Sequence, residues 1–214
     1  MKGAHDEAME AWGQAVQNGN SGEDRSRGYS LLEDPAARAK QLAFREVVLR
    51  EEKNVLTVLA TSSNNEQRAI AAEALGYARR SARQIAALVQ AGLDPDSTVR
   101  NNAMRALVVL VTADPKIGAK IPTGPFISLL SSGSWVDHNK VSLLFEAMTR
   151  SRDPQLLRDL RAQALDSLVE MARWRNPGHS GAAKMILGRI AGIDESMLEN
   201  TSAEAIVAAV MQKK

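Results

Sequence analysis

Residues 94–107 read DPDSTVRNNAMRAL, and this stretch carries the strongest indication of the fold. A similar stretch, EQRAIAAEALG, lies earlier at residues 66–76, and a shift of 32 residues carries Arg68 onto Arg100 together with two alanines and a leucine. In both copies a polar turn comes before a segment with small residues along one side. Alanine lets neighbouring helices approach closely, so the repetition predicts helical hairpins stacked in a row.

Working outward, the seven prolines mark where further helices begin or are joined. Proline lacks an amide donor and fixes φ, so it is tolerated in the first turn of a helix and breaks the interior. An aspartate before it can accept hydrogen bonds from the free amides, which makes Asp-Pro a helix-start signal. The chain has four such pairs: Asp34-Pro35, Asp94-Pro95, Asp114-Pro115 and Asp153-Pro154.

Between these marks the apolar residues recur at helical spacing, as they do over residues 157–171. No segment alternates strictly between apolar and polar residues. We therefore predict an all-α fold of about 9–11 helices in antiparallel hairpins and no sheet. Looser copies are expected at residues 125–150, with a turn at 132–139, and at 154–193, and an incomplete copy at 34–50.

The two ends of the chain differ from this array. Residues 4–17 are predicted to form a short amphipathic helix, and the polar stretch 17–30, without an aliphatic residue, is expected to be a mobile connector. Thr201 and Glu204 have capping-box spacing and predict a terminal helix. The expected organisation is an N-terminal helix and connector (1–33), a repeat array (34–193) and a C-terminal capping helix (194–214).

The motif at residues 94–100, DPDSTVR, resembles the HEAT-repeat signature, in which D-P-x-x-x-V-R occupies the turn and opens the second helix. The chain is most similar to bacterial HEAT-repeat (armadillo-type) proteins to which no function is assigned. The resemblance covers roughly residues 34–193 and implies an α-α superhelix, a solenoid. It implies no particular ligand.

Composition excludes several classes of function. With no cysteine, the chain has no disulfide, thiolate metal site or cysteine nucleophile. The three histidines are scattered and no catalytic motif is present, so we expect no enzyme activity, no cofactor and no metal. The longest apolar run, residues 106–111, is too short to span a bilayer. We expect a cytoplasmic protein by default, or a secreted or periplasmic one if a leader has been removed.

The charge is uneven along the chain. Residues 1–34 hold three Lys/Arg and seven Asp/Glu, which leaves 24 and 18 in the rest of the 27 and 25, an excess of about six positive charges. This excess is modest for a nucleic-acid-binding protein.

The second helices of the repeats provide the main candidate for partner binding. Second helices of α-solenoids commonly line the inner curve, and the row predicted there is mixed in charge and partly apolar, which suits a peptide or protein better than a polyanion. A solvated face is the alternative. The row contains Glu73, Tyr77, Asn102, Arg105, Val109, Glu146 and Arg150.

Three further residues, Arg68, Asp96 and Arg100, are predicted to form a structural ladder in which arginine braces successive turns. A phosphate-binding row is the alternative for these arginines.

Two aromatic clusters are secondary candidates, because tryptophan beside cationic residues can stack on bases or on a partner's side chains. The bland alternatives are that each tryptophan covers the end of the core and that Asp137 caps the next helix. The residues of the two clusters are Trp135, Asp137, His138 and Lys140, and Trp174 and His179.

From these features we expect a non-enzymatic scaffold that binds a protein or peptide along its concave face. Two other functions stay open. One is nucleic-acid binding or chemistry similar to that of the HEAT-like alkylpurine DNA glycosylases. The other is an accessory role similar to that of the HEAT-like phycobilin lyases.

Overall fold

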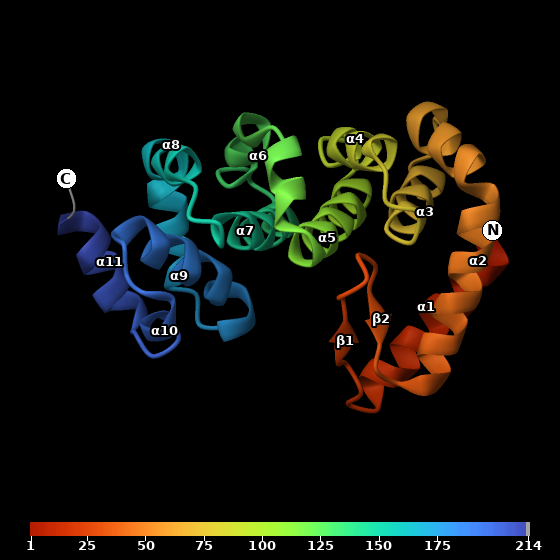
Figure 1. Ribbon diagram of the computed structural model, residues 1–214, viewed down its shortest axis with the longest axis horizontal. Helices are drawn as coiled ribbons and strands as arrows, with labels where there is room; N and C mark the ends of the chain where they lie inside the picture. The colour runs from red at the N-terminus through yellow and green to blue at the C-terminus, as the bar shows by residue number, and fades with distance from the viewer. Residues whose placement is uncertain (213–214) are drawn as a thin grey trace. The chain divides into compact units, whose positions relative to one another are not determined.

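A computed structural model describes residues 1–212 of the chain, and within them it is almost entirely helical, which confirms the all-α prediction (Figure 1). Over these residues there are eleven α-helices, one 3-10 helix and two very short strands. The chain forms two compact units, Met1–Lys120 and Ile121–Lys214. This division falls inside the segment that the sequence assigns to the repeat array.

The first unit combines an N-terminal helix and hairpin with four further α-helices. Its elements in chain order are α1 (Lys2–Gln17), β1 (Glu23–Asp24), β2 (Leu31–Leu32), α2 (Pro35–Thr61), α3 (Asn65–Leu75), α4 (Ala82–Ala91), α5 (Ser97–Ala113) and the 3-10 helix η1 (Pro115–Lys120).

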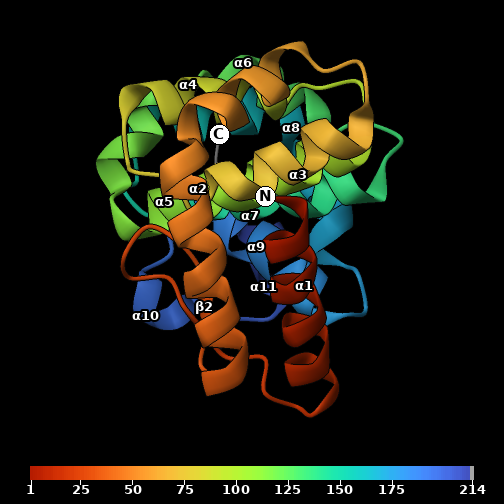
Figure 2. The ribbon, with the colours of Figure 1, turned by 90° about the vertical axis from the view of Figure 1, so that its right-hand side faces the viewer.

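Helix α2 is the longest element and begins as expected. Asp34 accepts hydrogen bonds from the amides of Ala36 and Ala37, and Pro35 is the first helical residue. The helix then runs without a break to Thr61, so the incomplete repeat predicted at 34–50 is the first part of a longer continuous element. Helices α1 and α2 lie side by side, and α3 packs between α2 and α5 (Figure 2).

The two copies of the repeated stretch open α3 and α5 with side-chain caps. Asn64 accepts from the amide of Gln67, and Asp96 accepts from the amides of Thr98 and Val99. In the second copy the Asp-Pro pair lies in the turn, as the HEAT-like motif implies, and α5 begins at Ser97. The small residues predicted to face a neighbour are buried here: Ala71, Ala74 and Ala103.

The stretch after α1 corrects two predictions. Strands β1 and β2 pair antiparallel, Glu23 with Leu32 and Asp24 with Leu31. The prediction of no sheet is therefore wrong, because the chain contains this short two-stranded sheet. The same stretch was expected to be a mobile connector, and the structure gives it a defined hairpin. Asp24 accepts from the amide and hydroxyl of Ser26, and Gly28, at φ +81°, takes a left-handed conformation that suits glycine.

Over residues 121–212 the second unit has six α-helices. They are α6 (Thr123–Leu129), α7 (Trp135–Thr149), α8 (Pro154–Ala172), α9 (Pro177–Ala191), α10 (Glu195–Leu198) and α11 (Ala203–Gln212). Helix α9 is central, because α7, α8, α10 and α11 all pack against it. Asp153 caps α8 as the Asp-Pro signal predicts. The terminal helix predicted from Thr201 and Glu204 forms as α11, but the capping side chain is Ser202, which accepts from the amide of Ala205, so the assignment of Thr201 as the cap is wrong.

Helix α7 begins earlier than the sequence indicates. The predicted turn at residues 132–139 is short, and Trp135 is the first residue of the helix. The capping side chain is Ser134, which accepts from the amide of Asp137, so the assignment of Asp137 as the cap is wrong. Asp137 is buried in the first turn, within 3.4 Å of the Ser132 hydroxyl.

Among the helices of residues 1–212, none combines the length and the apolar character needed to cross a membrane.

Candidate functional site

Five residues of the predicted row belong to the first unit, and the chain's own N-terminal segment, residues 1–33, contacts three of them. Glu73 is on α3, Tyr77 follows α3, and Asn102, Arg105 and Val109 are on α5. Asn102 joins the two helices by donating to the carbonyl of Ala69 at 3.0 Å. We call these five residues with helices α3 and α5 the α3–α5 surface.

The strongest contact of the N-terminal segment with this surface is an ion pair. Arg105 donates to the carboxylate of Glu23, which also accepts from Arg25 Nε and Nη2 at 2.8 and 2.7 Å. The Glu23 side chain is only 12% exposed. Burial raises the pKa of Glu23, but the guanidinium groups of Arg105 and Arg25 outweigh it and lower the pKa below its ordinary value. Glu23 is therefore held as a carboxylate between two arginines.

A second polar contact joins α1 to α3. His5 Nε2 lies 3.1 Å from Glu73 Oε2, and His5 Nδ1 lies 3.2 Å from Asp6 Oδ1. The hydrogen bond to Glu73 raises the pKa of His5; burial works against it, and Asp6 adds to the rise. A cavity of about 370 Å³ opens beside this contact, lined by residues of α1, α3 and α5 that include Lys2, Glu66 and Thr98.

A continuous series of rings runs from α1 through α2 to the hairpin. His5 meets the buried Phe44 edge to face with centroids 5.6 Å apart, and Phe44 meets Tyr77 in the same way at 5.4 Å. Tyr77 lies 6.5 Å from Tyr29 of the hairpin, and the guanidinium carbon of Arg45 sits 4.4 Å from the centre of the Tyr29 ring. Such ring and cation–π contacts add to the apolar burial that holds the N-terminal segment.

Tyr77 is buried at the centre of this series. Its hydroxyl accepts from Gln41 Nε2 at 3.1 Å, and Gln41 Oε1 accepts from the amide of Leu32 at 2.8 Å, so one side chain ties β2 to the end of α3. Burial, with help from the nearby Glu73, raises the pKa of Tyr77 to about 12. At neutral pH Tyr77 is therefore a neutral hydroxyl.

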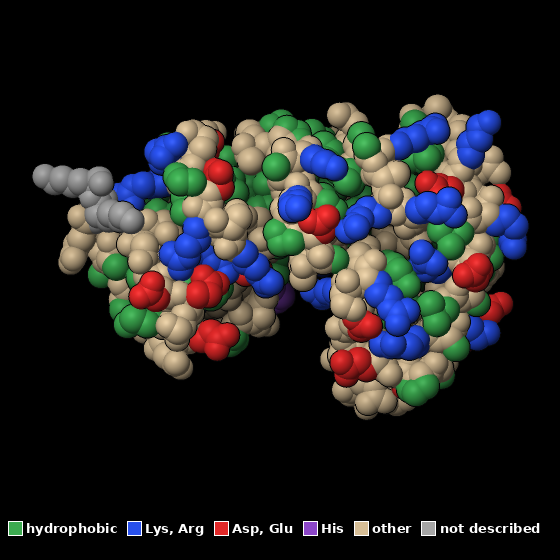
Figure 3. Space-filling view, in the orientation of Figure 1, with side chains coloured by type: hydrophobic (Ala, Val, Ile, Leu, Met, Phe, Trp, Pro, Cys, Tyr) green, Lys and Arg blue, Asp and Glu red, His purple; other side chains and the backbone are tan. Residues whose placement is uncertain are grey.

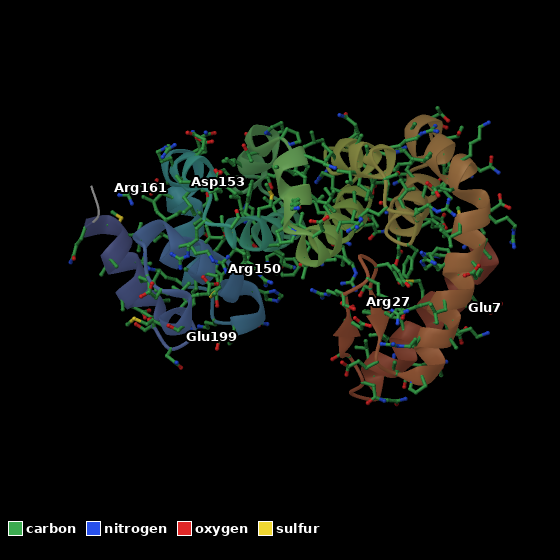
Figure 4. All side chains as sticks on the ribbon, viewed as in Figure 1. Glu7, Arg27, Arg150, Asp153, Arg161 and Glu199 are labelled. Carbon is green, nitrogen blue, oxygen red and sulfur yellow. The ribbon has the colours of Figure 1, made fainter. Side chains whose placement is uncertain are left out.

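The tip of the hairpin reaches the far end of α5. A Cβ atom placed on Gly28 would lie 3.8 Å from a methyl of Leu110 and 3.9 Å from Ala113. Val109, one turn earlier on α5, is buried. Figure 3 shows basic and acidic side chains interleaved over this hairpin, and Figure 4 labels Arg27 near its tip. The N-terminal segment therefore contacts the α3–α5 surface at Glu73, Tyr77 and Arg105 and reaches the end of α5.

The predicted ladder residues have the following contacts. Arg68 donates to Asp94 through Nε and Nη2 at 2.8 and 2.9 Å, and to the carbonyl of Ser62 through Nη1 at 3.0 Å. Arg100 donates to the carbonyls of Asp94 and Pro95. Asp96, besides capping α5, accepts from Asn65 at 2.8 Å. Arg68 therefore joins the turn before α3 to the turn before α5 by binding the Ser62 carbonyl and the Asp94 carboxylate.

The other two row residues are in the second unit: Glu146 lies on α7, and Arg150, labelled in Figure 4, directly follows this helix. Glu146 binds Arg150 at 3.1 Å and also Arg189 Nη2 at 3.1 Å. Arg189 is 1% exposed, pairs with Glu195, and donates to the Glu146 carbonyl and the Thr149 hydroxyl. These contacts join α7, α9 and α10 and belong to the core of the unit.

The two aromatic clusters predicted as separate candidates form one group, which we call the ring cluster: Trp135, His138, Trp174 and His179. The Trp135 and His179 rings meet edge to face with centroids 4.8 Å apart, and His138 stacks on Trp174 at 6.2 Å. Trp135 is 51% exposed. About half of its surface is therefore turned to solvent, and the other half is packed. Lys140 follows on the same helix and Asp137 is buried beneath.

Sequence reasoning missed three residues that matter at these sites. His5 and Glu23 lie in the segment treated as an appendage, and their partners are far away in the chain: 68 residues for His5 and 82 for Glu23. Arg189 was missed although a signal exists, since it falls on the apolar face of α9 with Ala182 and Ile186.

Within residues 1–212, no group of three or more His, Asp or Glu side chains is placed to hold a metal ion. No protein-family model and no curated protein matches the chain.

Proposed function

We propose that this chain is a non-enzymatic interaction module that binds a peptide on the α3–α5 surface, with its own N-terminal segment as the present internal occupant. The observation that carries this proposal is the pair formed by Arg105 and Glu23 over the buried Tyr77. A surface that holds one polar, aromatic segment by these contacts has the chemistry to hold another of the same kind.

The contacts favour a peptide over a polyanion. Arg105 offers a guanidinium to a carboxylate, while Glu73 offers a carboxylate to an imidazole, so the two ends of the surface select opposite charges. The middle is aromatic and apolar. A polyanion would meet Glu73 and would find, among the five residues of the α3–α5 surface, a single cation, Arg105. An acidic segment with an aromatic residue and a distal basic group fits all three parts.

The HEAT-type solenoid is part of the same proposal. It is supported by the packing of α3 on α5 and by the equivalent positions of Arg68 and Arg100 near the starts of these helices. In such a repeat protein a surface formed by second helices is the expected place for a partner.

The test uses a fluorescently labelled peptide of residues 1–33 added to the full-length chain, with binding followed by anisotropy. Replacing His5 by Ala together with Glu23 by Gln weakens the chain's own segment, because each removes a hydrogen bond to a charged group worth about 1.5–3 kcal/mol. We expect this double variant to bind the added peptide at least about tenfold more tightly than the unmodified chain.

Arg105→Ala in the double-variant background should abolish most of this binding, and Arg83→Ala, at an exposed position of α4, is the matched control. Circular dichroism establishes that each variant is folded. Failure of every folded variant to bind the peptide, or equal binding with and without Arg105, would contradict the proposal.

A further inference from the structure

The ring cluster lies where two helices of the second unit begin. Trp135 is the first residue of α7 and His138 follows three positions later, on the same face. Trp174 lies in the link between α8 and α9, and His179 is in the first turn of α9. The contacts of Trp135 with His179 and of His138 with Trp174 both cross from α7 to the segment at the start of α9, so two ring pairs join these elements.

Two features of the cluster are not explained by contacts within the fold. Half of the Trp135 side chain faces solvent, although only three of the 214 residues are tryptophan. His138 Nε2 and His179 Nδ1 are buried without a hydrogen-bond partner in the described part of the chain. Buried polar atoms are nearly always paired, so two unpaired ring nitrogens in one cluster require an explanation.

Two exposed arginines adjoin the cluster in the sequence. Arg173 and Arg175 flank Trp174 in the sequence and both are exposed. Among residues 1–212 neither side chain forms an ion pair. The first turns of α7 and α9 add the partial positive charge of helix N-termini. The acidic side chain within the first turn of α7, Asp137, is buried rather than presented at the surface.

We propose that the ring cluster binds a planar aromatic base that carries a phosphate, as found in a nucleotide or in single-stranded nucleic acid. The exposed face of Trp135 stacks on the base, and Arg173 and Arg175 bind the phosphate. An uncharged aromatic ligand would leave the two arginines without a role, and a bare phosphate would leave Trp135 without one. This site is separate from the α3–α5 surface and does not depend on the peptide proposal.

The test is a fluorescence titration of the full-length chain at low salt with adenosine monophosphate, a single-stranded oligothymidine and a DNA duplex. Because stacking quenches indole emission, we expect quenching by one of the first two ligands. Tighter binding of the oligonucleotide assigns the site to single strands, and tighter binding of the nucleotide assigns it to the free ligand. The duplex should bind more weakly than the single strand, since its bases are already stacked.

Variants separate the two parts of the site. Trp135→Ala should weaken binding about tenfold, and Trp135→Phe should restore much of it. Arg173→Gln with Arg175→Gln should weaken binding and flatten its dependence on salt. The matched charge control is Arg83→Gln with Arg158→Gln, two exposed arginines outside the cluster, and Trp12→Phe removes the signal of the first unit's tryptophan.

Several results would overturn the proposal. These are no binding of either ligand by the folded chain, tightest binding of the duplex, or an affinity unchanged by Trp135→Ala. An equal loss in the charge control and in the Arg173 and Arg175 variant would also overturn it, because binding would then follow net charge alone.

Discussion

The α3–α5 surface and the ring cluster both gather charged and aromatic residues, but they differ in how far the chain itself satisfies them. On the α3–α5 surface, Arg105 is paired with Glu23, Glu73 with His5, and Tyr77 is covered by Tyr29. At the ring cluster Trp135 is half exposed and two ring nitrogens are buried without a partner among the described residues. The α3–α5 surface is occupied by the chain's own N-terminal segment, whereas the ring cluster is partly exposed to solvent.

The difference shows that substituting the same type of residue can lower the stability of the fold by different amounts. Removing a partner from a satisfied site leaves a buried charge or polar group unpaired and lowers the stability of the fold. Removing a half-exposed side chain from an open site changes little in the fold and changes ligand binding instead. The predictions below follow this contrast, beginning with the largest effect.

The most costly change is expected at Arg189, the buried hub of the second unit. Arg189→Ala leaves the carboxylates of Glu146 and Glu195 without their shared partner, and we expect the free energy of unfolding of that unit to fall by about 3–5 kcal/mol. Urea denaturation followed by the fluorescence of Trp135 and Trp174 measures it. Arg158→Ala, on the exposed side of α8, serves as the control. A loss no larger than that of the control would show that the network is not structural.

A smaller loss is expected when the N-terminal segment is loosened at Glu23. Glu23→Gln removes the charge shared by Arg105 and Arg25, and we expect the first unit to lose about 1–3 kcal/mol. A double-mutant cycle with Arg105→Ala measures the coupling between the two side chains. Additive losses would mean that this ion pair does not hold the segment.

The contact of His5 with Glu73 should depend on pH. Because the pKa of His5 is raised in the folded chain, its contribution to stability is fully present below the ordinary value of 6.5 and is lost as the pH rises through the raised pKa. The facing carboxylates are Glu73 and Asp6. We expect unfolding of the first unit, measured in urea on either side of pH 6.5, to lose part of its pH dependence in His5→Gln. An identical dependence in both proteins would rule the contact out.

The smallest effect on stability is expected at Trp135. Since half of the side chain is already in solvent, Trp135→Ala should change the unfolding free energy of the second unit by no more than about 0.5 kcal/mol. Thermal denaturation by circular dichroism checks this. A loss of several times that size would show that Trp135 supports the fold and that the ring cluster, like the α3–α5 surface, serves contacts within the chain.

Sequence reasoning succeeded where the signal is local. The caps at Asp34 and Asp153, the repeated arginines of α3 and α5 and the helical spacing of the apolar residues all depend on neighbours within a few positions. Asp94-Pro95 lies in the turn, where the HEAT-like motif also puts it, and Asp96 is the residue that caps α5.

The candidate sites were predicted only in part, because their chemistry depends on contacts between distant residues. Glu23 and Arg105 are 82 residues apart, and nothing in residues 17–30 alone indicates that they fold into a hairpin with its tip against α5. The members of the ring cluster were each found from composition. That these residues lie together could be seen only from the packing of α7 against α9.

The most direct test of the central claim is whether the N-terminal segment can be displaced from the α3–α5 surface. The chain has no cysteine, so Gln14→Cys on α1 and Arg83→Cys on α4 allow two spin labels without background, and pulsed electron resonance measures the distance between them. We predict one narrow distance population for the chain alone and a second, longer one when excess peptide of residues 1–33 is added. A single unchanged population at saturating peptide would contradict the claim that the segment is an exchangeable occupant.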